Sequence, residues 1–193
     1  MSDFAVIFIG ACLVNNLIFD YLLGVSPAIA MSRKLETAIG MSSAMICVLT
    51  LAALISYPFR NLVLVPLGLE YLQTLSFIFI ITLTVLLGEK VLQRVNPVIH
   101  ERVAVFIPLT LINTSGLGVA LLNIEQAHGL MGSLFFGLGA GAGFGLAIIM
   151  LSAMHYRIAV DDVPGPFQGA AITLITLGII AMAFKGFTGI VSL

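Results

Sequence analysis

Several polar side chains interrupt the long apolar runs of this sequence, and they are the first candidates for chemistry. Asp20 lies in the run that begins near Phe4. A carboxylate inside a membrane helix costs about 2.5 to 3.5 kcal/mol on insertion scales and usually marks an ion path or a charged partner. Asn15 and Asn16 place two amides in the same run. We treat Asp20, Asn15 and Asn16 as ion-path candidates; the alternatives are that Asp20 is solvated at the interface and that the amides bridge helices.

Two short segments combine helix-breaking residues with small polar side chains. They read GVSP at residues 24–27 and NTSGLG at residues 113–118. A break in a membrane helix frees backbone N–H and C=O groups, which persist only where protein or a cavity surrounds them. We therefore expect both breaks to face inward, with Ser26, Thr114 and Asn113 beside half-helix ends that can hold an ion or a cofactor. The alternative is that the hydroxyls only satisfy the freed backbone groups.

Two further charged residues lie near the ends of apolar runs. Glu89 is followed by Lys90 at the end of the third run, where an interfacial ion pair is the simplest interpretation. Lys185 lies in or beside the last apolar run, and its side chain could extend to the outer interface. We keep Glu89 and Lys185 as ion-path candidates beside these alternatives.

The residue types that most often bind metals are scattered along the chain. Cys12 and Cys47 match neither a disulfide framework nor a CxxC spacing, and we expect them to be small buried residues. His100, His128 and His155 fall in separate loops without a ligand spacing, so interfacial solvation is the expectation. No metal site is predicted from these residues.

The composition excludes several classes of protein. The 193 residues are 60% hydrophobic and 9% charged, whereas soluble domains carry roughly 25% charged residues. The net charge is -1 and no basic run occurs, so we expect membrane lipid and not nucleic acid as a partner. Glycines alternate from Gly137 to Gly145 in GxxxG spacings, which predicts a helix packed closely against another helix or subunit. No strand precedes them, so they are not a dinucleotide-binding loop.

Six windows are apolar and long enough to cross a bilayer core of about 30 Å. They cover approximately residues 4–24, 38–57, 71–88, 103–122, 130–154 and 170–187. The sequence therefore predicts an all-α polytopic membrane protein in which residues 1–193 form a single integral membrane domain. Each group of three helices opens with a broken helix, so we predict an inverted 3+3 repeat over about 1–95 and 96–193, with helices 1 and 4 broken. The short apolar patch at 61–68 is expected to be interfacial.

The basic residues are unevenly distributed over the two sides that six spans would create. One side holds six of the eight Lys and Arg residues: Arg33, Lys34, Lys90, Arg94, Arg102 and Arg157. The other side holds Arg60. By the positive-inside rule the richer side is cytoplasmic, so both termini are expected to be outside, in the periplasm of a Gram-negative bacterium.

Four stretches match a known family of membrane subunits. They are LVNN at 13–16, SRKLETAIGM at 32–41, INTSGLGVALLN at 112–123 and DVPGPFQGAAITLITLGIIAMAFKGFTGIV at 162–191. In collinear order over nearly the whole chain they resemble the family shared by the Rnf electron-transport complex and the sodium-translocating NADH:quinone reductase. The resemblance implies a bacterial inner-membrane subunit with both termini periplasmic. It also implies a homologous, RnfE-like partner of opposite topology among the other Rnf subunits.

The resemblance also implies a cofactor for which this sequence lacks the ligands. The family has a cysteine in each broken helix, and with the partner's cysteines these hold a 2Fe-2S cluster; here the two positions are Ser26 and Thr114. Hydroxyls are hard and protonated at neutral pH and are poor replacements for thiolates. Cys12 cannot substitute, because fourteen helical residues separate it from Ser26 by about 21 Å. Three interpretations are open: the partner supplies all ligands of the cluster, no cluster is present, or the chain is specialised away from electron transfer. We favour the absence of a normal cluster.

The function implied is that of a membrane subunit in an ion-translocating oxidoreductase. It would form part of the electron and ion path that couples ferredoxin:NAD electron transfer to Na⁺ or H⁺ transport, as a translocase subunit that is not catalytic alone. Asp20 and Lys185 also depart from the family pattern and suggest altered ion coupling. The alternatives are a small secondary transporter with its site at the two breaks and a scaffolding subunit without a redox role.

Overall fold

The computed structural model describes residues 3–95, 106–111, 113–126, 129–158 and 163–189, and this part of the chain is helical without strands. The prediction of an all-helical protein with several apolar helices is thus confirmed. The α-helices are α1 (Asp3–Ile9), α2 (Val25–Met31), α3 (Leu35–Phe59), α4 (Gln73–Val95), α6 (Ile107–Leu111), α7 (Thr114–Glu125), α8 (Leu130–Ile158) and α9 (Ala170–Lys185). A π-helical turn, Gly10–Val14, extends α1, and another, Arg60–Leu64, extends α3. Short 3-10 turns, Glu70–Leu72 and Gly165–Phe167, precede α4 and α9.

Three helical segments among the described residues are apolar and long enough to cross a membrane. They are Leu35–Leu64, Glu70–Val91 and Leu130–Ile158, and two shorter apolar helices are Phe4–Val14 and Ala170–Lys185. These agree with the predicted second, third and fifth windows. Helix α4 continues to Val95, so Glu89 lies inside this helix and not at its end. The first part of the predicted interfacial patch is the π-helical turn that continues α3.

Helices α3 and α8 form the centre of the fold because glycines let their backbones approach closely. Gly137, Gly141 and Gly145 lie on the face of α8 that meets α3. A Cβ atom added to Gly141 would lie 2.6 Å from the Cα of Ile46, and one added to Gly137 would lie 2.7 Å from the Cα of Thr50. The GxxxG spacing therefore packs against another helix, as predicted.

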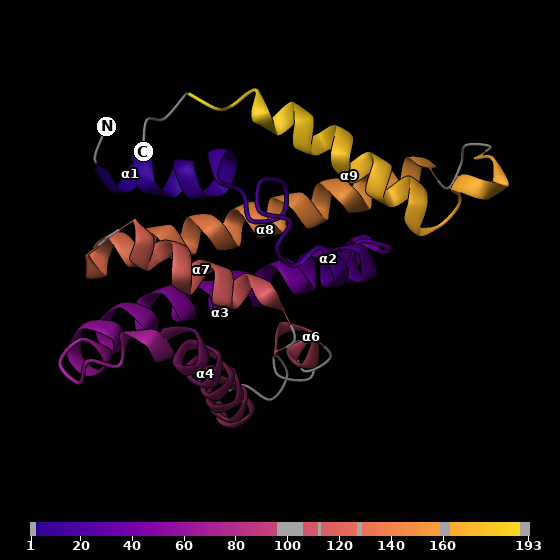
Figure 1. The fold of residues 1–193 in the computed structure, drawn as a ribbon. Helices are drawn as coiled ribbons and strands as arrows, with labels where there is room; N and C mark the ends of the chain where they lie inside the picture. Colours follow the sequence, from indigo (N-terminus) through magenta and orange to yellow (C-terminus); the bar gives the residue numbers. More distant parts are fainter. Residues whose placement is uncertain (1–2, 96–105, 112, 127–128, 159–162, 190–193) are drawn as a thin grey trace.

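A second glycine face of α8 packs against the N-terminal helix. A Cβ atom on Gly139 would lie 2.5 Å from the carbonyl oxygen of Phe8, and one on Gly143 would lie 2.5 Å from the carbonyl oxygen of Cys12. Later residues of α8 thus contact later residues of the N-terminal helix, so α1 and α8 run parallel. Later residues of α8 contact earlier residues of α3, so α3 runs antiparallel to α8. Figure 1 shows α8 between α1 and α9 on one side and α3 and α7 on the other.

The first interruption of the helices differs from the predicted position. The chain leaves its helical course after Val14 and returns to it at Val25, so the interruption is residues 15–24 and not 24–27. Ser26 and Pro27 form the first turn of α2, where proline is tolerated because the backbone N–H groups of a first turn have no intrahelical acceptor. Proline therefore begins the second half-helix and does not end the first.

The second interruption also differs from the predicted position, because of the predicted residues 113–118 only Asn113 lies outside a helix. Helix α6 ends at Leu111, and α7 begins at Thr114 after Asn113 in an extended conformation. The Asn113 side chain accepts a hydrogen bond of 3.0 Å from the backbone N–H of Ser115, a common N-cap arrangement.

Candidate functional site

The two interruptions meet beside the middle of α8. The backbone N–H of Gly24 donates a hydrogen bond of 3.2 Å to Thr114 Oγ1. Gly24 has a φ of 75°, and a Cβ atom there would lie 2.2 Å from Ser115 Oγ and 2.6 Å from Asn113 Oδ1. Only glycine fits this close approach, because a side chain would be strained by the backbone and would clash with both polar groups.

A pocket of about 340 Å³ opens at this meeting point, and both Ser26 and Thr114 line it. The structure thus brings together two predicted site residues from opposite interruptions. Leu22, Pro27 and Leu109 contribute its apolar wall. Ser26 and Thr114 are both exposed on the surface of the single chain. In contrast, Asn113 and Ser115 behind them are buried.

The buried Asn16 holds the first interruption in place. Its amide nitrogen donates to the carbonyl oxygens of Cys12 and Gly143, each over 2.9 Å. Its Oδ1 accepts from the backbone N–H groups of Ile18 and Phe19 over 3.0 and 3.3 Å. These contacts replace the helical hydrogen bonds that the unwound segment lacks and fix its depth against α8.

The remaining amides at the interruptions have different surroundings. Asn15 is half-buried and its backbone N–H closes the π-helical turn onto Gly10. The amide nitrogen of Asn113 donates to the sulfur of Met45 over 3.4 Å. Ser115 Oγ is buried and has no hydrogen-bond partner among the described residues, and leaving such a group unpaired costs about 1 to 3 kcal/mol.

Asp20 and Lys185 form an ion pair, which sequence reasoning treated as two separate features. The Lys185 ammonium donates to Asp20 Oδ1 and joins the first interruption to the end of α9. In the structure the two charges thus neutralise each other. A lone acid and a lone base in apolar surroundings are the sequence signal for such a pair.

Glu89 is the one predicted ion-path residue that lies in a separate place. It is half-buried and lines a pocket of about 370 Å³ between α3, α4 and α6, with Cys47 on the opposite wall. This pocket shares no lining residue with the pocket of Ser26 and Thr114. Glu89 therefore does not contribute to the site where the interruptions meet.

The donor atoms at the meeting point do not fit a 2Fe-2S cluster. Ser26 and Thr114, at the positions where the resemblance implies cysteines, offer hydroxyl oxygens, and Thr114 Oγ1 already accepts a hydrogen bond from the Gly24 N–H. Iron-sulfur clusters need thiolates or imidazoles. Cys12 packs beside Gly143 and Cys47 lines the other pocket, and the described residues hold no group of three His, Cys, Asp or Glu side chains suited to a metal.

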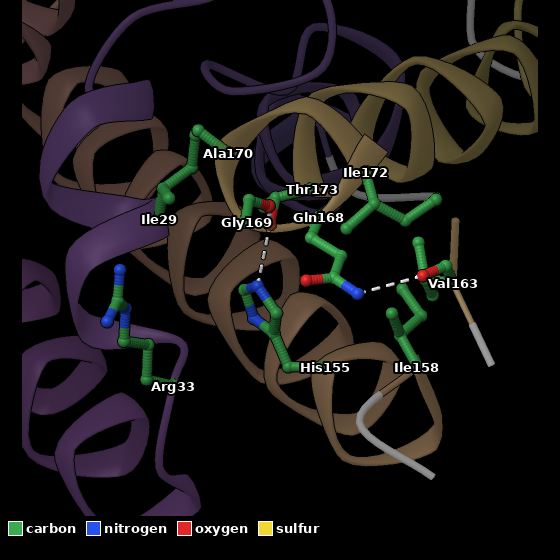
Figure 2. Close-up of a pocket in the computed structure, with 10 residues that line it drawn as sticks. All are labelled: Ile29, Arg33, His155, Ile158, Val163, Gln168, Gly169, Ala170, Ile172 and Thr173. Atoms are coloured by element: carbon green, nitrogen blue, oxygen red, sulfur yellow. Dashed lines mark hydrogen bonds between the residues drawn. The ribbon is translucent and has the colours of Figure 1, made fainter. Parts of the chain in front are cut away.

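A further pocket, of about 480 Å³, lies between the ends of α2, α8 and α9 (Figure 2). His155, in the last turn of α8, shares hydrogen bonds with Ser32 Oγ at 3.1 Å and Thr173 Oγ1 at 2.8 Å. His155 thus connects α8 to the end of α2 and to α9. The prediction that it is a solvated loop residue is wrong. Arg33 lies at one side of this pocket and Gln168 at the other (Figure 2). The other two histidines, His100 and His128, lie outside the described residues.

Comparison with known proteins gives one consistent result. A family model described as "Rnf-Nqr subunit, membrane protein" matches residues 4–191. A protein of Pseudoalteromonas atlantica, named as a subunit of the ion-translocating oxidoreductase complex, is 48% identical over 191 residues, which are 99% of each chain. Proteins of the same name from Vibrio cholerae and Yersinia enterocolitica are 45% and 44% identical, with coverage of 100% and 99% of each chain.

Proposed function

The chain belongs to the Rnf-Nqr family of membrane subunits, and we propose that it is the corresponding subunit of a bacterial ion-translocating oxidoreductase complex. The observation that carries this proposal is a sequence identity of 44 to 48% over at least 99% of the chain and of the relatives. The subunit would work within a translocase and not catalyse a reaction alone. A separate secondary transporter is less well supported, because relatives of full length have the name of a complex subunit.

We propose a six-span inverted 3+3 repeat for its architecture in the inner membrane, with both termini in the periplasm. The parallel course of α1 and α8 and the antiparallel course of α3 support this proposal, because spans one and five point the same way in such a topology. Helices α3 and α8 would be equivalent elements of the two halves. Two interruptions that meet beside the middle of α8 fit a site near the bilayer midplane.

A homologous, RnfE-like membrane subunit of opposite topology is the proposed neighbour at this site. Ser26 and Thr114 are exposed on the isolated chain, although they lie at the depth of the middle of α8. Polar groups at that depth are rarely directed at lipid. A partner with similar interruptions could cover the pocket and complete its wall.

We further propose that this chain contributes no iron ligand and takes part in the ion path. Ser26 and Thr114 offer oxygens, which suit hard cations better than iron-sulfur clusters. Of the predicted ion-path residues, Asp20, Asn15, Asn16, Asn113 and Lys185 belong to the interruptions or contact them, and Glu89 does not.

Purification of the complex through a tag on another subunit tests both parts of the proposal. The wild-type chain should co-purify, and its absence would contradict assignment to the complex. Iron content per complex should be unchanged when Ser26 and Thr114 are replaced together by Ala and Val, because neither hydroxyl binds iron. A loss of about two iron atoms per complex in this variant, the content of one 2Fe-2S cluster, would contradict the ligand assignment.

A further inference from the structure

The Asp20–Lys185 ion pair lies at the depth of the middle of α8. Asp20 is one hydrogen-bonded turn after Asn16, because its backbone N–H donates to the Asn16 carbonyl oxygen over 2.8 Å. Asn16 in turn donates to the carbonyl oxygen of Gly143, which is close to the centre of the 29-residue helix α8. In a bilayer this helix is long enough to span the hydrocarbon core, so its centre is near the midplane.

A second contact holds the same two elements together. The rings of Phe19 and Phe184, the neighbours of Asp20 and Lys185, have centroids 4.4 Å apart. Phe19 is buried. The end of α9 is thus attached to the first interruption by one aromatic contact and one ion pair, which fixes the position of the Lys185 ammonium.

The ion pair nevertheless lies on the surface of the chain. The Lys185 side chain is 64% exposed and that of Asp20 is 20% exposed. An ammonium group near the midplane is strongly disfavoured in hydrocarbon unless it reaches an interface. Because Lys185 is bound to Asp20, its side chain does not extend to an interface, and its outer side must face protein or water.

We propose that this surface, formed by Asp20, Tyr21, Leu22 and Lys185, binds a neighbouring membrane subunit that directs uncharged hydrogen-bond acceptors at Lys185. Asp20 already neutralises the charge, so the partner needs carbonyl or hydroxyl oxygens and not a carboxylate. Tyr21 and Leu22 are 38% and 63% exposed and add apolar area. Leu22 also lines the pocket of Ser26 and Thr114, so the two surfaces are continuous. The proposal rests on the proposed function, because the neighbour is another subunit of the complex.

A double-mutant cycle tests the role of the pair in assembly. The variants are Asp20→Asn, Lys185→Met and the double variant, each expressed with the complete complex. Each single variant leaves one unpaired charge, so the amount of chain that co-purifies with another subunit should fall about fivefold or more. The double variant should recover only in part, because it removes the unpaired charge of each single variant but leaves the partner's acceptors without the Lys185 ammonium. Dividing the co-purified amount by the total amount of the chain in the membrane separates an effect on assembly from an effect on insertion.

Photo-crosslinking identifies what covers the pair. Benzoylphenylalanine at Tyr21 is a conservative aromatic replacement beside Asp20, and the same probe at Phe79, which is 70% exposed on α4, is the comparison. The Tyr21 probe should yield a specific crosslink to another subunit in the intact complex. A lipid adduct or no protein crosslink at Tyr21 would overturn the proposal, as would single variants that assemble normally or a double variant as impaired as the worse single variant. Failure of the wild-type chain to co-purify would instead contradict the proposed function.

Discussion

At the scale of single residues, the meeting point of the two interruptions depends on the absence of a side chain at Gly24. Its backbone is left-handed, and the side chains of Asn113 and Ser115 occupy the space that a Cβ atom would need. Gly68, after the π-helical turn that extends α3, also has a positive φ, 65°, but has no atom within 4 Å of an added Cβ. The same Gly→Ala substitution at the two positions therefore separates the cost of backbone strain from the cost of a steric clash.

We expect Gly24→Ala to destabilise the protein by about 2 to 5 kcal/mol, the sum of a left-handed backbone cost and overpacking. Gly68→Ala should cost only about 1 to 2 kcal/mol, because no clash occurs there. Thermal unfolding of the purified protein in detergent measures the difference. Equal midpoints for the two variants would contradict the close contact between the interruptions.

The sequence predicts some of these residues well and others poorly, for identifiable reasons. Ser26 and Thr114 are found because glycine and proline mark local breaks in helix pattern. The Asp20–Lys185 pair is not found, because its members are 165 positions apart and local patterns contain no information about which distant helices meet. One of the four hydrogen bonds of Asn16 also depends on tertiary structure, since its acceptor belongs to Gly143 of α8.

At the scale of elements, α8 organises the fold through two glycine faces. Gly141 and its neighbours one turn away face α3, while Gly139 and Gly143 face α1 and its π-helical turn. The GxxxG spacing predicts such close packing, but it does not identify the two partner helices. The predicted end of the first half-helix was also wrong, because proline was interpreted as a helix stop although it is compatible with a first turn.

Gly141→Ala tests the packing of α3 against α8. The new methyl group would meet the Ile46 backbone, so we expect a loss of about 1 to 3 kcal/mol despite the higher helix propensity of alanine. Gly178→Ala in α9 is the matched control, because nothing lies within 4 Å of its added Cβ. Thermal unfolding in detergent should show a lower midpoint for Gly141→Ala alone. A control that is equally destabilised would show that the effect does not arise from this interface.

At the scale of the whole molecule, hydropathy predicts more than local breaks do. The windows at 38–57, 71–88 and 130–154 correspond to long apolar helices. Helices α3 and α8 run antiparallel, as the second and fifth of six spans would. The first and fourth windows are harder to predict, since each is divided into shorter helices whose hydrogen bonds are completed by other parts of the chain. Arg102, one of the residues used to orient the protein, lies outside the described residues.

Reporter fusions test the orientation. Alkaline phosphatase fused after Leu193 should be active, and green fluorescent protein at the same place should be dark, because the proposed C-terminus is periplasmic. Fusions after Ile158, at the end of α8, should give the opposite result, since this end carries Arg157 and the proposed loop is cytoplasmic. Fluorescence after Leu193 together with phosphatase activity after Ile158 would reverse the topology.

The contact between Asp20 and Lys185 also restricts which substitutions can accumulate at these two positions during evolution. A lineage that gained only one of the two charges would pass through a form with an isolated ion within its membrane region, a state that selection removes where stability is marginal. Descendants are therefore expected to keep both residues or to lose both. Since the two codons are far apart in the same gene, joint retention would reflect constraint on the protein and not proximity in the DNA.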